Sequence, residues 1–455
     1  MVILDISTAD VSAFVHQIPT KSLSDQSYIV VVGNEAVAID IQRDLDRFEG
    51  VLAEVDVPLV AVFETHIHND YVSGGRRFAD LHDAAYVLPA NSDAQYRHDR
   101  IADGETIEVG GWVVRAMHTP GHTFNHMSYV LESPDGSVAI FSGGSMLVGA
   151  VGRSDLSGPD HTKELLASQF ASVNRIANEL PDPSLVAPTH GAGSFCASGG
   201  SADSTSTISQ EKLRNPALLA PSVEVFSMAQ SMSMKMYPSY YRHMAPANLD
   251  TIDDPPTADL SVLTSVEDVE DATIVDIRPF AEYASGHIPG SLSFEVSNDA
   301  AVYIGWTLEW DSSLVLVGSV EHTETIRTHL VRIGWDNIVG RIRPEDVARF
   351  ASGGLATIRT IDFRELSDMM PLPVLDVRDP LEYESGVVPG ADLVHLSGVA
   401  ARPELFADDG PVVVHCASGY RASIAASFIA AAGGSPIVVV DSIANFEGTM
   451  AKPAV

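Results

Sequence analysis

The sequence contains a short run in which two histidines and an aspartate alternate with other residues, Thr65-His66-Ile67-His68-Asn69-Asp70. On an extended segment, side chains two residues apart project to the same side, so His66 and His68 are expected to face one partner. Imidazole nitrogens and carboxylate oxygens are ligands of Zn(II) and of non-haem iron. The alternative is a pair of surface histidines in a loop, but further histidines downstream favour a metal site.

Two of these later histidines stand where predicted strands end. The predicted strand 113–117 leads into Thr119-Pro120-Gly121, a turn sequence that presents His122. The run 185–188 leads to His190. Loops at the carboxyl ends of strands are where many α/β and sandwich enzymes carry their chemistry. We therefore expect His122 and His190 to join the first pair.

The elements that must position these histidines follow from hydrophobic patterns. The apolar run 59–63 predicts a buried strand directly before the first histidine pair. The segments 28–32 and 36–40 flank Gly33-Asn34 and predict a β-hairpin. Helices are expected over 45–54, from near residue 73, and over 161–180, where apolar residues fall on one face.

The longer segment around these histidines resembles the metallo-β-lactamase fold. It reads Glu64-Thr65-His66-Ile67-His68-Asn69-Asp70-Tyr71-Val72-Ser73-Gly74-Gly75. It is most similar to the persulfide dioxygenase and glyoxalase II branch, and closest to versions fused to rhodanese domains. The resemblance implies an αββα sandwich. It also implies metal ligands, which in this sequence are His66, His68 and His122 for one metal, with Asp70 and His190 belonging to a second position.

Two positions depart from that family's pattern. Tyr71 stands where the signature ends in histidine, and Gly144 stands where the family has the aspartate of Thr-Gly-Asp. Glycine has no side chain and cannot bind a metal, whereas three histidines suffice for one Zn or Fe with open positions. We therefore predict one metal ion per chain, with Fe(II) favoured and Zn(II) as the alternative.

Candidate substrate contacts are Tyr71, Arg153, Tyr241 and Arg242. The last two lie in an aromatic segment, 236–244, which can cap a pocket and hold a carboxylate-bearing thiol such as glutathione. The alternative is a domain-closing helix that packs its tyrosines on the sandwich, and periodicity does not separate the two. Cys196 is interpreted as a small buried residue.

Beyond an acidic, proline-rich linker, 248–259, the sequence repeats itself. Asp276-Ile277-Arg278 with Glu282-Tyr283 aligns with Asp376-Val377-Arg378 with Glu382-Tyr383. This period is domain-sized and too long for a solenoid, and the pattern resembles the rhodanese fold. We predict an α/β multidomain protein: a metallo-β-lactamase-like sandwich over 1–250, followed by rhodanese-like domains over 258–352 and 358–455.

The second repeat carries a cysteine between a predicted strand, 411–415, and a predicted helix, in Cys416-Ala417-Ser418-Gly419-Tyr420-Arg421. Backbone N–H groups and the helix dipole stabilise a thiolate at such a place. The loop resembles the Cys-x-x-Gly-x-Arg cradle of active rhodaneses. We predict that Cys416 carries a persulfide rather than being a structural cysteine. Ser418, Gly419 and Arg421 are the other predicted catalytic residues, Arg421 adding charge for an anionic sulfur donor.

The first repeat has Gly318-Ser319-Val320-Glu321 at the corresponding place. This segment contains no cysteine, and the Glu321 carboxylate would repel an anionic substrate. We predict that this domain is not catalytic and serves packing, spacing or dimer contact. Arg278 and His287 in it are interpreted as structural.

Composition narrows the classes of partner and compartment. The 455 residues carry a formal net charge of −34, which would repel nucleic acid and anionic lipid. No apolar run of membrane-spanning length occurs, and we expect no signal peptide. Cys196 and Cys416 fall in different predicted domains, so a disulfide is not expected, which fits a reducing cytoplasm.

These patterns give one leading hypothesis and two alternatives. The leading one is a cytoplasmic enzyme of sulfane-sulfur metabolism. Cys416 would transfer sulfur between thiosulfate or a persulfide and thiols, and the metal domain would oxidise a low-molecular-weight persulfide. One alternative is thioester hydrolysis by Zn-bound hydroxide, as in glyoxalase II. The other is a sulfur-binding or sensing protein with a degenerate metal site. A homodimer is left open, and no nucleic acid or membrane partner is expected.

Overall fold

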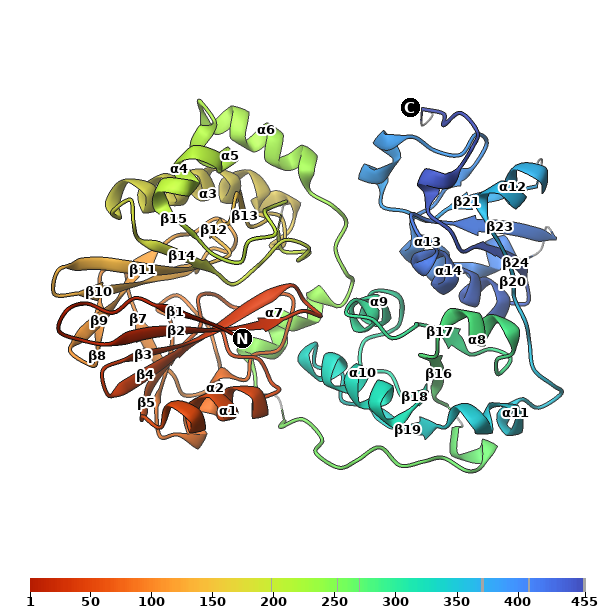
Figure 1. Ribbon diagram of the computed structural model, residues 1–455, viewed down its shortest axis with the longest axis horizontal. Helices are drawn as coiled ribbons and strands as arrows, with labels where there is room; N and C mark the ends of the chain where they lie inside the picture. Colours follow the sequence, from red (N-terminus) through yellow and green to blue (C-terminus); the bar gives the residue numbers. More distant parts are fainter. Residues whose placement is uncertain (198, 252, 270, 370–371, 408–409, 453–455) are drawn as a thin grey trace. The chain divides into compact units, whose positions relative to one another are not determined.

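The computed structural model describes residues 1–452 with gaps at 198, 252, 270, 370–371 and 408–409. The chain separates into two compact units (Figure 1). The first comprises Met1–Tyr237, Tyr241–Pro255 and Val331–Gly334; the second comprises Pro238–Tyr240, Pro256–Leu330 and the chain from Trp335 onward. In the described part of the chain, no helix is long and apolar enough to cross a membrane.

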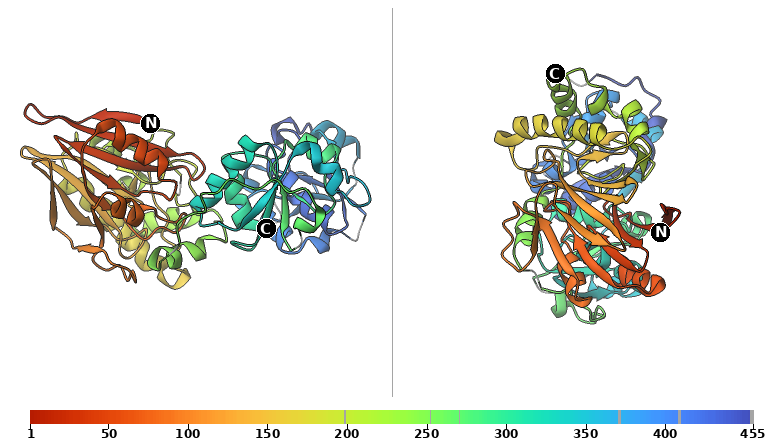
Figure 2. Two further views of the ribbon diagram at one scale, coloured as in Figure 1. Left: turned by 90° about the horizontal axis from the view of Figure 1, so that it is seen from below. Right: turned by 90° about the vertical axis from the view of Figure 1, so that its left-hand side faces the viewer.

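The first unit is built on two β-sheets, seen from two further directions in Figure 2. The seven-stranded sheet runs, in spatial order, β1 (Val2–Asp5), β2 (Ala13–Thr20), β3 (Asp25–Val32), β4 (Glu35–Ile39), β5 (Leu59–Phe63), β6 (Ala85–Pro89) and β7 (Asp99–Ile101). The six-stranded sheet runs β15 (Ser206–Thr207), β14 (Leu185–Pro188), β11 (Gly136–Gly143), β10 (Met127–Ser133), β9 (Trp112–His118) and β8 (Thr106–Val109). The short pair β12 (Met146–Leu147) and β13 (Ala150–Val151) lies apart from both.

Hydrophobic side chains from both sheets form one core between them, including Val30, Phe63, Tyr129 and Phe141. Helices α1 (Asp46–Val55) and α2 (Gly75–Leu81) cover the outer face of the larger sheet. The other sheet is covered by α3 (Pro159–Glu179), α4 (Ile208–Arg214), α5 (Pro216–Leu219) and α6 (Val223–Ser233), and α7 (Tyr241–Leu249) follows. The first unit is therefore an αββα sandwich, as predicted.

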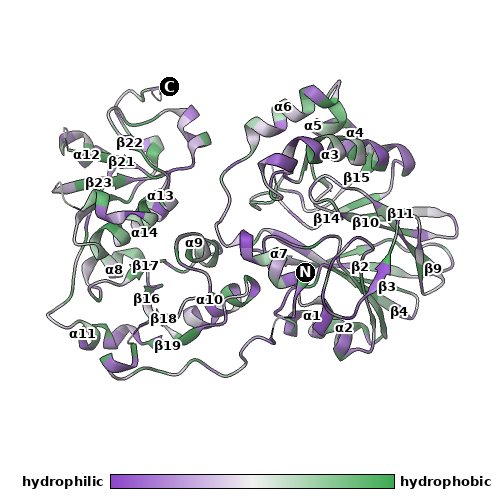
Figure 3. Cartoon of the chain, turned by 180° about the vertical axis from the view of Figure 1, so that it is seen from behind, coloured by the Kyte–Doolittle hydropathy of each residue, from purple (hydrophilic) through white to green (hydrophobic). Residues whose placement is uncertain are grey.

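The local predictions in this unit are confirmed with small shifts at the ends. Strands β3 and β4 pair antiparallel across the Gly33-Asn34 turn, with Val32 opposite Glu35. The helix expected from near residue 73 begins at Gly75, two residues later. The long helix α3 buries Leu165, Val173 and Ile176 on one face, and its banded hydropathy is visible in Figure 3. One apolar face against a sheet is what the helical period of its sequence requires.

The second unit contains two sheets, one for each sequence repeat. The first has the parallel strand order β17 (Leu292–Ser293), β16 (Thr273–Asp276), β18 (Leu314–Val317), β19 (Ile338–Ile342). The second has the order β20 (Arg359–Ile361), β24 (Ser435–Val439), β23 (Pro411–His415), β21 (Val374–Asp376), β22 (Asp392–Leu393), also parallel. The repeat seen in the sequence is therefore a repeat of structure.

Helices surround both sheets of the second unit. The first repeat contributes α8 (Phe280–Ser285), α9 (Ala300–Thr307), α10 (Val320–Arg332) and α11 (Val347–Phe350). The second contributes α12 (Phe363–Met369), α13 (Leu396–Ala401) and α14 (Tyr420–Ala431). Short 3₁₀ helices occur at Val266–Val269, Pro344–Asp346, Pro380–Ser385, Pro403–Phe406 and Ile443–Asn445.

Candidate metal centre and cysteine loop

Three buried histidines meet where strands of both sheets of the first unit end. His66 follows β5, His122 follows β9 and His190 follows β14. One ligand nitrogen from each lies within 4.8 Å of the others. The ring centroids of His66 and His122 are 4.8 Å apart, and those of His122 and His190 are 5.2 Å apart. The fold thus gathers side chains that are more than a hundred residues apart in sequence.

Each of these rings is held by one nitrogen and leaves the other available. Nδ1 of His122 donates to the carbonyl oxygen of Arg153 at 2.7 Å. Nδ1 of His190 lies 2.9 Å from the Asp25 carboxylate, and Nδ1 of His66 lies 2.9 Å from the Thr65 hydroxyl. Among the described residues, no hydrogen-bond partner is found for Nε2 of any of the three. Buried nitrogens without partners are costly unless a ligand takes them up.

This arrangement fits a transition-metal ion. Burial, followed by the charge of neighbouring histidines, lowers the pKa of His66 and of His122 well below the usual value, so both rings are neutral and can donate a lone pair. A carbonyl or carboxylate on the far nitrogen is the usual way in which a metal-binding histidine is oriented. Three imidazoles suit Zn(II) or Fe(II).

The predicted ligand His68 lies beside this cluster, but its Nε2 faces away from it. That nitrogen is 2.9 Å from Glu64 and 3.2 Å from Asp40. Burial lowers the pKa of His68, but the two carboxylates outweigh burial and raise it well above the usual value. Its Nδ1 has no partner among the described residues. The structure therefore gathers His66, His122 and His190, with His68 as an adjoining ring 4.2 Å from His66.

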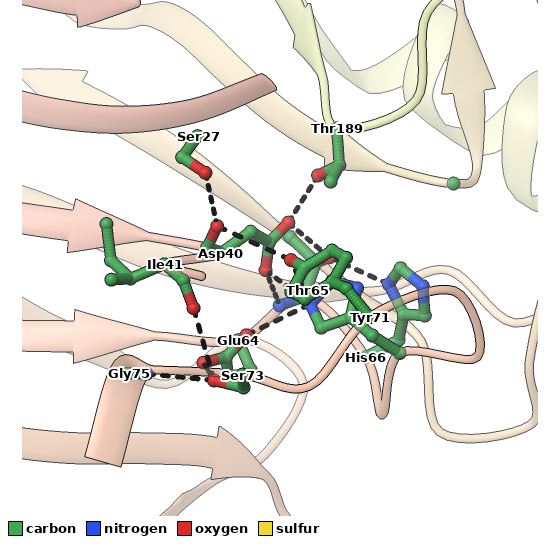
Figure 4. A network of polar contacts seen from close by, with 12 residues as sticks. Ser27, Asp40, Ile41, Glu64, Thr65, His66, Tyr71, Ser73, Gly75 and Thr189 are labelled. Carbon is green, nitrogen blue, oxygen red and sulfur yellow. Dashed lines mark hydrogen bonds and ion pairs between the residues drawn. The ribbon is translucent and has the colours of Figure 1, made fainter. Parts of the chain in front are cut away.

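Asp40 is the buried anchor of the loop that carries the first histidine pair (Figure 4). Its carboxylate accepts from the backbone N–H of Thr65 at 2.7 Å and from the Thr65 hydroxyl at 2.8 Å, and it also accepts from the Thr189 hydroxyl. Because Thr65 donates to Asp40, its oxygen is left to accept from Nδ1 of His66. Asp40 therefore fixes the orientation of His66 through one intervening hydroxyl.

Tyr71, which replaces a histidine of the family signature, packs into this same network. Its ring stacks on His68 at 4.2 Å and its hydroxyl lies 2.9 Å from Nε2 of His68. The side chain is fully buried. The Tyr71 side chain, which was predicted to contact the substrate, therefore faces the interior of the loop.

Asp70 and Cys196 form a second cluster with His190. One ligand atom from each of the three lies within 4.8 Å of the others. Asp70 Oδ2 is 3.4 Å from Nδ1 of His190, the nitrogen that also contacts Asp25. Burial raises the pKa of Asp25 and of Asp70 to about 7. Burial also raises the pKa of the Cys196 thiol well above its usual value, so Cys196 is a buried neutral thiol, as expected.

Gly144 leaves no room for the carboxylate that the family carries there. A Cβ atom at this position would lie 2.3 Å from Cδ2 of His122. The His122 ring therefore occupies the space that a side chain at position 144 would need.

The other three predicted substrate contacts, Arg153, Tyr241 and Arg242, differ in their burial and in their partners. Arg153 is buried and holds Asp155 with Nε at 2.6 Å and Nη2 at 2.8 Å, so it braces the loop behind His122. Tyr241 is buried with its hydroxyl 3.8 Å from the Cys196 sulfur, whereas Arg242 is exposed and its Nε donates to His243. A cavity of about 280 Å³ borders the histidine loops and is lined by residues including Ile67, Asn69, Thr123, Phe124, Asn125 and Leu249.

In the second unit, Cys416 follows β23 and precedes α14, as predicted. It is buried and is not in a disulfide. Gly419 has a φ of 100°, a conformation that favours glycine, and its N–H donates to the Cys416 sulfur at 3.2 Å. Ser418 is exposed at the tip of the loop. The loop thus presents a backbone donor to the sulfur at a helix N-terminus.

Arg421 was interpreted from the sequence as charge for an anionic donor, but its guanidinium is engaged within the fold. Nη2 lies 2.9 Å from Oε1 of Glu382, and Nη1 bonds the other oxygen of the same carboxylate. The sequence pattern includes Glu382 in the repeated Glu-Tyr motif but does not predict its pairing with Arg421, which lies 39 residues away.

The first repeat has no equivalent of this loop. In the two sheets, Val317 and His415 both pair with the aspartate of the Asp-x-Arg motif, so Gly318 corresponds to Cys416. Helix α10 already begins at Val320. The structure agrees with a repeat that lacks the cysteine loop.

Comparisons with known proteins agree with the two architectures. The family model "Rhodanese-like domain" matches residues 262–339 and 362–448. A metallo-β-lactamase structure from Staphylococcus aureus subsp. aureus COL is similar with a TM-score of 0.67 and 28% identity, over 73% of this chain and 99% of that chain.

Two curated proteins are similar to part of the chain. The chain is 31% identical over 191 residues to the probable polyketide biosynthesis zinc-dependent hydrolase BaeB of Bacillus velezensis, covering 39% of this chain and 79% of that protein. It is 36% identical over 131 residues to the atrochrysone carboxyl ACP thioesterase of Aspergillus chevalieri, covering 27% of this chain. The chain spans 40% of the length of that fungal protein.

Proposed function

The chain belongs to the metallo-β-lactamase-fold proteins that carry two rhodanese-like domains, and from this premise we propose that it is an enzyme of sulfane-sulfur metabolism. Cys416 would take up and pass on a sulfur atom, and the metal centre of the first unit would oxidise a low-molecular-weight persulfide. The single observation that carries the proposal is the pairing, in one chain, of a three-histidine cluster with available Nε2 atoms and a cysteine loop with a donor aimed at its sulfur.

One metal ion per chain would be held by His66, His122 and His190, with His68 and Asp70 beside them. Fe(II) is favoured over Zn(II) because the neighbouring domain handles reduced sulfur, and iron, when bound, supplies the activation of O₂ that oxidation of sulfur requires. The balanced reaction is RSSH + O₂ + H₂O → RSH + SO₃²⁻ + 2H⁺.

The residues of the chain itself would position the reactants. Arg153 and Asp25 hold two of the histidines from behind, and Asp40 holds the third through Thr65. The cavity at Asn69, Thr123 and Phe124 would receive the carrier part of the persulfide. At Cys416, the thiolate would attack the outer sulfur of a donor. A new S–S bond would form, the donor's S–S bond would break, and the donor would leave with the electron pair.

Oxygen uptake tests the proposal. Anaerobically iron-loaded protein of known metal content is mixed with an organic persulfide, and O₂ consumption and sulfite are measured. We expect uptake that is lost in His66→Ala and retained in Cys416→Ser, while sulfur transfer to cyanide shows the opposite pattern. Absence of O₂ uptake by iron-loaded protein would contradict the oxidative role.

A second candidate, thioester hydrolysis, is favoured by one specific observation. The relatives of the chain include a protein named as a thioesterase and one named as a zinc-dependent hydrolase. Zn(II), when bound, supplies an activated water for this reaction. Hydrolysis of a glutathione thioester by zinc-loaded protein, lost in His122→Ala and unchanged in Cys416→Ser, would support hydrolysis over oxidation.

A further inference from the structure

The Cys416 loop leads into an arginine, Arg421, that already forms an ion pair with a carboxylate. Both terminal nitrogens of Arg421 bond the two oxygens of Glu382, an arrangement that fixes the guanidinium as well as neutralising it. Oε2 of Glu382 also accepts from the backbone N–H of Asp379 at 3.1 Å, so the carboxylate is anchored from a second side. Burial raises the pKa of Glu382, but Arg421 outweighs it and holds the pKa below the usual value, so the carboxylate is ionised.

Arg378, the arginine of the Asp-x-Arg motif in this repeat, is also paired with a carboxylate. Arg378 is bound to Asp376 at 2.6 Å and to the carbonyl oxygen of Gly386 at 2.8 Å. Residues 358–455 contain one lysine, Lys452, near the end of the chain. Burial lowers the pKa of His395, which is therefore neutral near pH 7. A donor that reaches Cys416 therefore meets two arginines, Arg378 and Arg421, that are already paired with carboxylates.

The repeat without a cysteine supplies an aromatic wall beside the loop. The hydroxyl of Tyr420, the residue before Arg421, donates to the carbonyl oxygen of Glu295 at 3.0 Å and accepts from the Ser297 hydroxyl at 2.8 Å. The ring of Tyr303 lies 5.8 Å from that of Tyr420, and Trp306 lies 4.9 Å from His395. Carbon-rich walls favour an organic donor over a small inorganic anion.

We propose that Glu382 is a specificity-determining residue: by occupying Arg421 it makes Cys416 accept organic persulfides in preference to thiosulfate. The inference rests on the proposed sulfur transfer at Cys416. With a persulfide, Cys-S⁻ + RSS⁻ → Cys-SS⁻ + RS⁻, and the leaving group carries one charge. With thiosulfate, Cys-S⁻ + S₂O₃²⁻ → Cys-SS⁻ + SO₃²⁻, and the donor and its leaving group are dianions. The reaction with thiosulfate therefore depends more strongly on a cationic side chain that is not already paired with a carboxylate.

The experiment compares two donors on wild-type protein, Glu382→Gln and Glu382→Asp. Glu282→Gln is the matched control, because Glu282 is the same motif residue in the repeat without a cysteine and is exposed. Each protein is assayed with cysteine persulfide and with thiosulfate, with cyanide as acceptor, and kcat/KM is obtained for both donors. Mass spectrometry then records whether Cys416 has gained one sulfur atom.

We expect wild-type protein, Glu382→Asp and Glu282→Gln to prefer the persulfide by about tenfold or more in kcat/KM. In Glu382→Gln, the released Arg421 should raise kcat/KM for thiosulfate by about tenfold, with a change of less than about threefold for the persulfide. A loss of protein structure would lower both values together and would not change their ratio in this direction.

Two results would overturn the inference alone: a wild-type preference for thiosulfate, or a donor ratio that is the same in Glu382→Gln as in wild-type protein. If Cys416 gains no sulfur from either donor in wild-type protein, the proposed sulfur transfer fails, and the inference falls with it. The mass measurement therefore separates the two failures.

Discussion

Restoring the family's aspartate at position 144 should weaken metal binding rather than add a ligand. From the sequence alone, Gly144→Asp would be expected to complete a carboxylate-containing site. In the structure, the new Cβ would lie 2.3 Å from Cδ2, 2.6 Å from Cγ and 2.9 Å from Nε2 of His122. The ring cannot retreat freely because its Nδ1 donates to the Arg153 carbonyl oxygen at 2.7 Å.

The magnitude follows from the two costs of moving that ring. Forcing a side chain into a filled interior costs about 1–3 kcal/mol of folding free energy. Disturbing the hydrogen bond that orients a metal-binding histidine lowers metal affinity by about 10–100-fold. We therefore expect Gly144→Asp and Gly144→Ala alike to lose at least tenfold in Zn(II) affinity. The measurements are chelator competition for affinity, mass spectrometry for bound metal, and urea unfolding for stability.

Gly50→Ala is the matched control, because Gly50 lies inside α1 and a Cβ there would meet nothing within 4 Å. It should leave metal affinity unchanged and stabilise the protein by about 0.5–1 kcal/mol, since alanine favours the helix. If Gly144→Asp instead bound metal more tightly than wild-type protein, or bound two equivalents, the steric argument would be wrong. The prediction of one metal per chain would fail with it.

Three further predictions follow from other parts of the structure. Removing metal with a chelator should lower the Tm of the first unit and leave that of the second unchanged in calorimetry, because the ligands join loops from both sheets of one unit and binding stabilises only the folded state. In the metal-free protein, Asp25 has a pKa of about 7 when folded, so the folded state holds a proton that the unfolded state loses near pH 4. Stability should therefore fall as pH rises from 4 to 7, and Asp25→Asn should flatten that slope in urea titrations. Arg378→Met should destabilise the second repeat by about 3–5 kcal/mol, since it leaves the buried carboxylate of Asp376 uncompensated, and hydrogen exchange of β21 and β23 would detect it.

Much of the first unit could be predicted because its signals are local in sequence. The β3–β4 hairpin, the strand before His66 and the helix α3 each follow from a pattern within about twenty residues. His122 and His190 could be recognised because each ends a strand. The architecture that brings them together came from a family resemblance, not from periodicity.

The groups that orient the histidines could not be predicted, because they lie far away along the chain. Asp25 contacts His190 across 165 residues and Asp40 contacts Thr189 across 149. A lone aspartate at the end of a strand carries no local sign that it will be buried against a histidine. The pairing of Glu382 with Arg421 also joins residues that are distant in sequence, 39 residues apart. Pairings of this kind depend on topology, and single-sequence patterns do not report them.

The two repeats separate what the shared motif does from what the cysteine loop does. In both, the arginine of Asp-x-Arg binds the aspartate at 2.6 Å and the carbonyl oxygen of the glycine eight residues later, at 3.0 Å for Arg278 and 2.8 Å for Arg378. Because these two contacts of the arginine are present with and without a cysteine, they belong to the fold and not to the proposed sulfur transfer.

Introducing a cysteine into the first repeat should therefore not create a second sulfur-transfer site. Gly318 occupies the position that corresponds to Cys416, but a Cβ there would lie 2.8 Å from Cγ1 of Ile277. The helix that follows starts at Val320, so the N–H groups that would surround a sulfur enter α10 instead. In a Cys416→Ser background, Gly318→Cys should take up no sulfur from a persulfide by mass spectrometry. Uptake there would mean that any cysteine after a central strand suffices, and that the loop from Cys416 to Gly419 contributes nothing beyond its thiol.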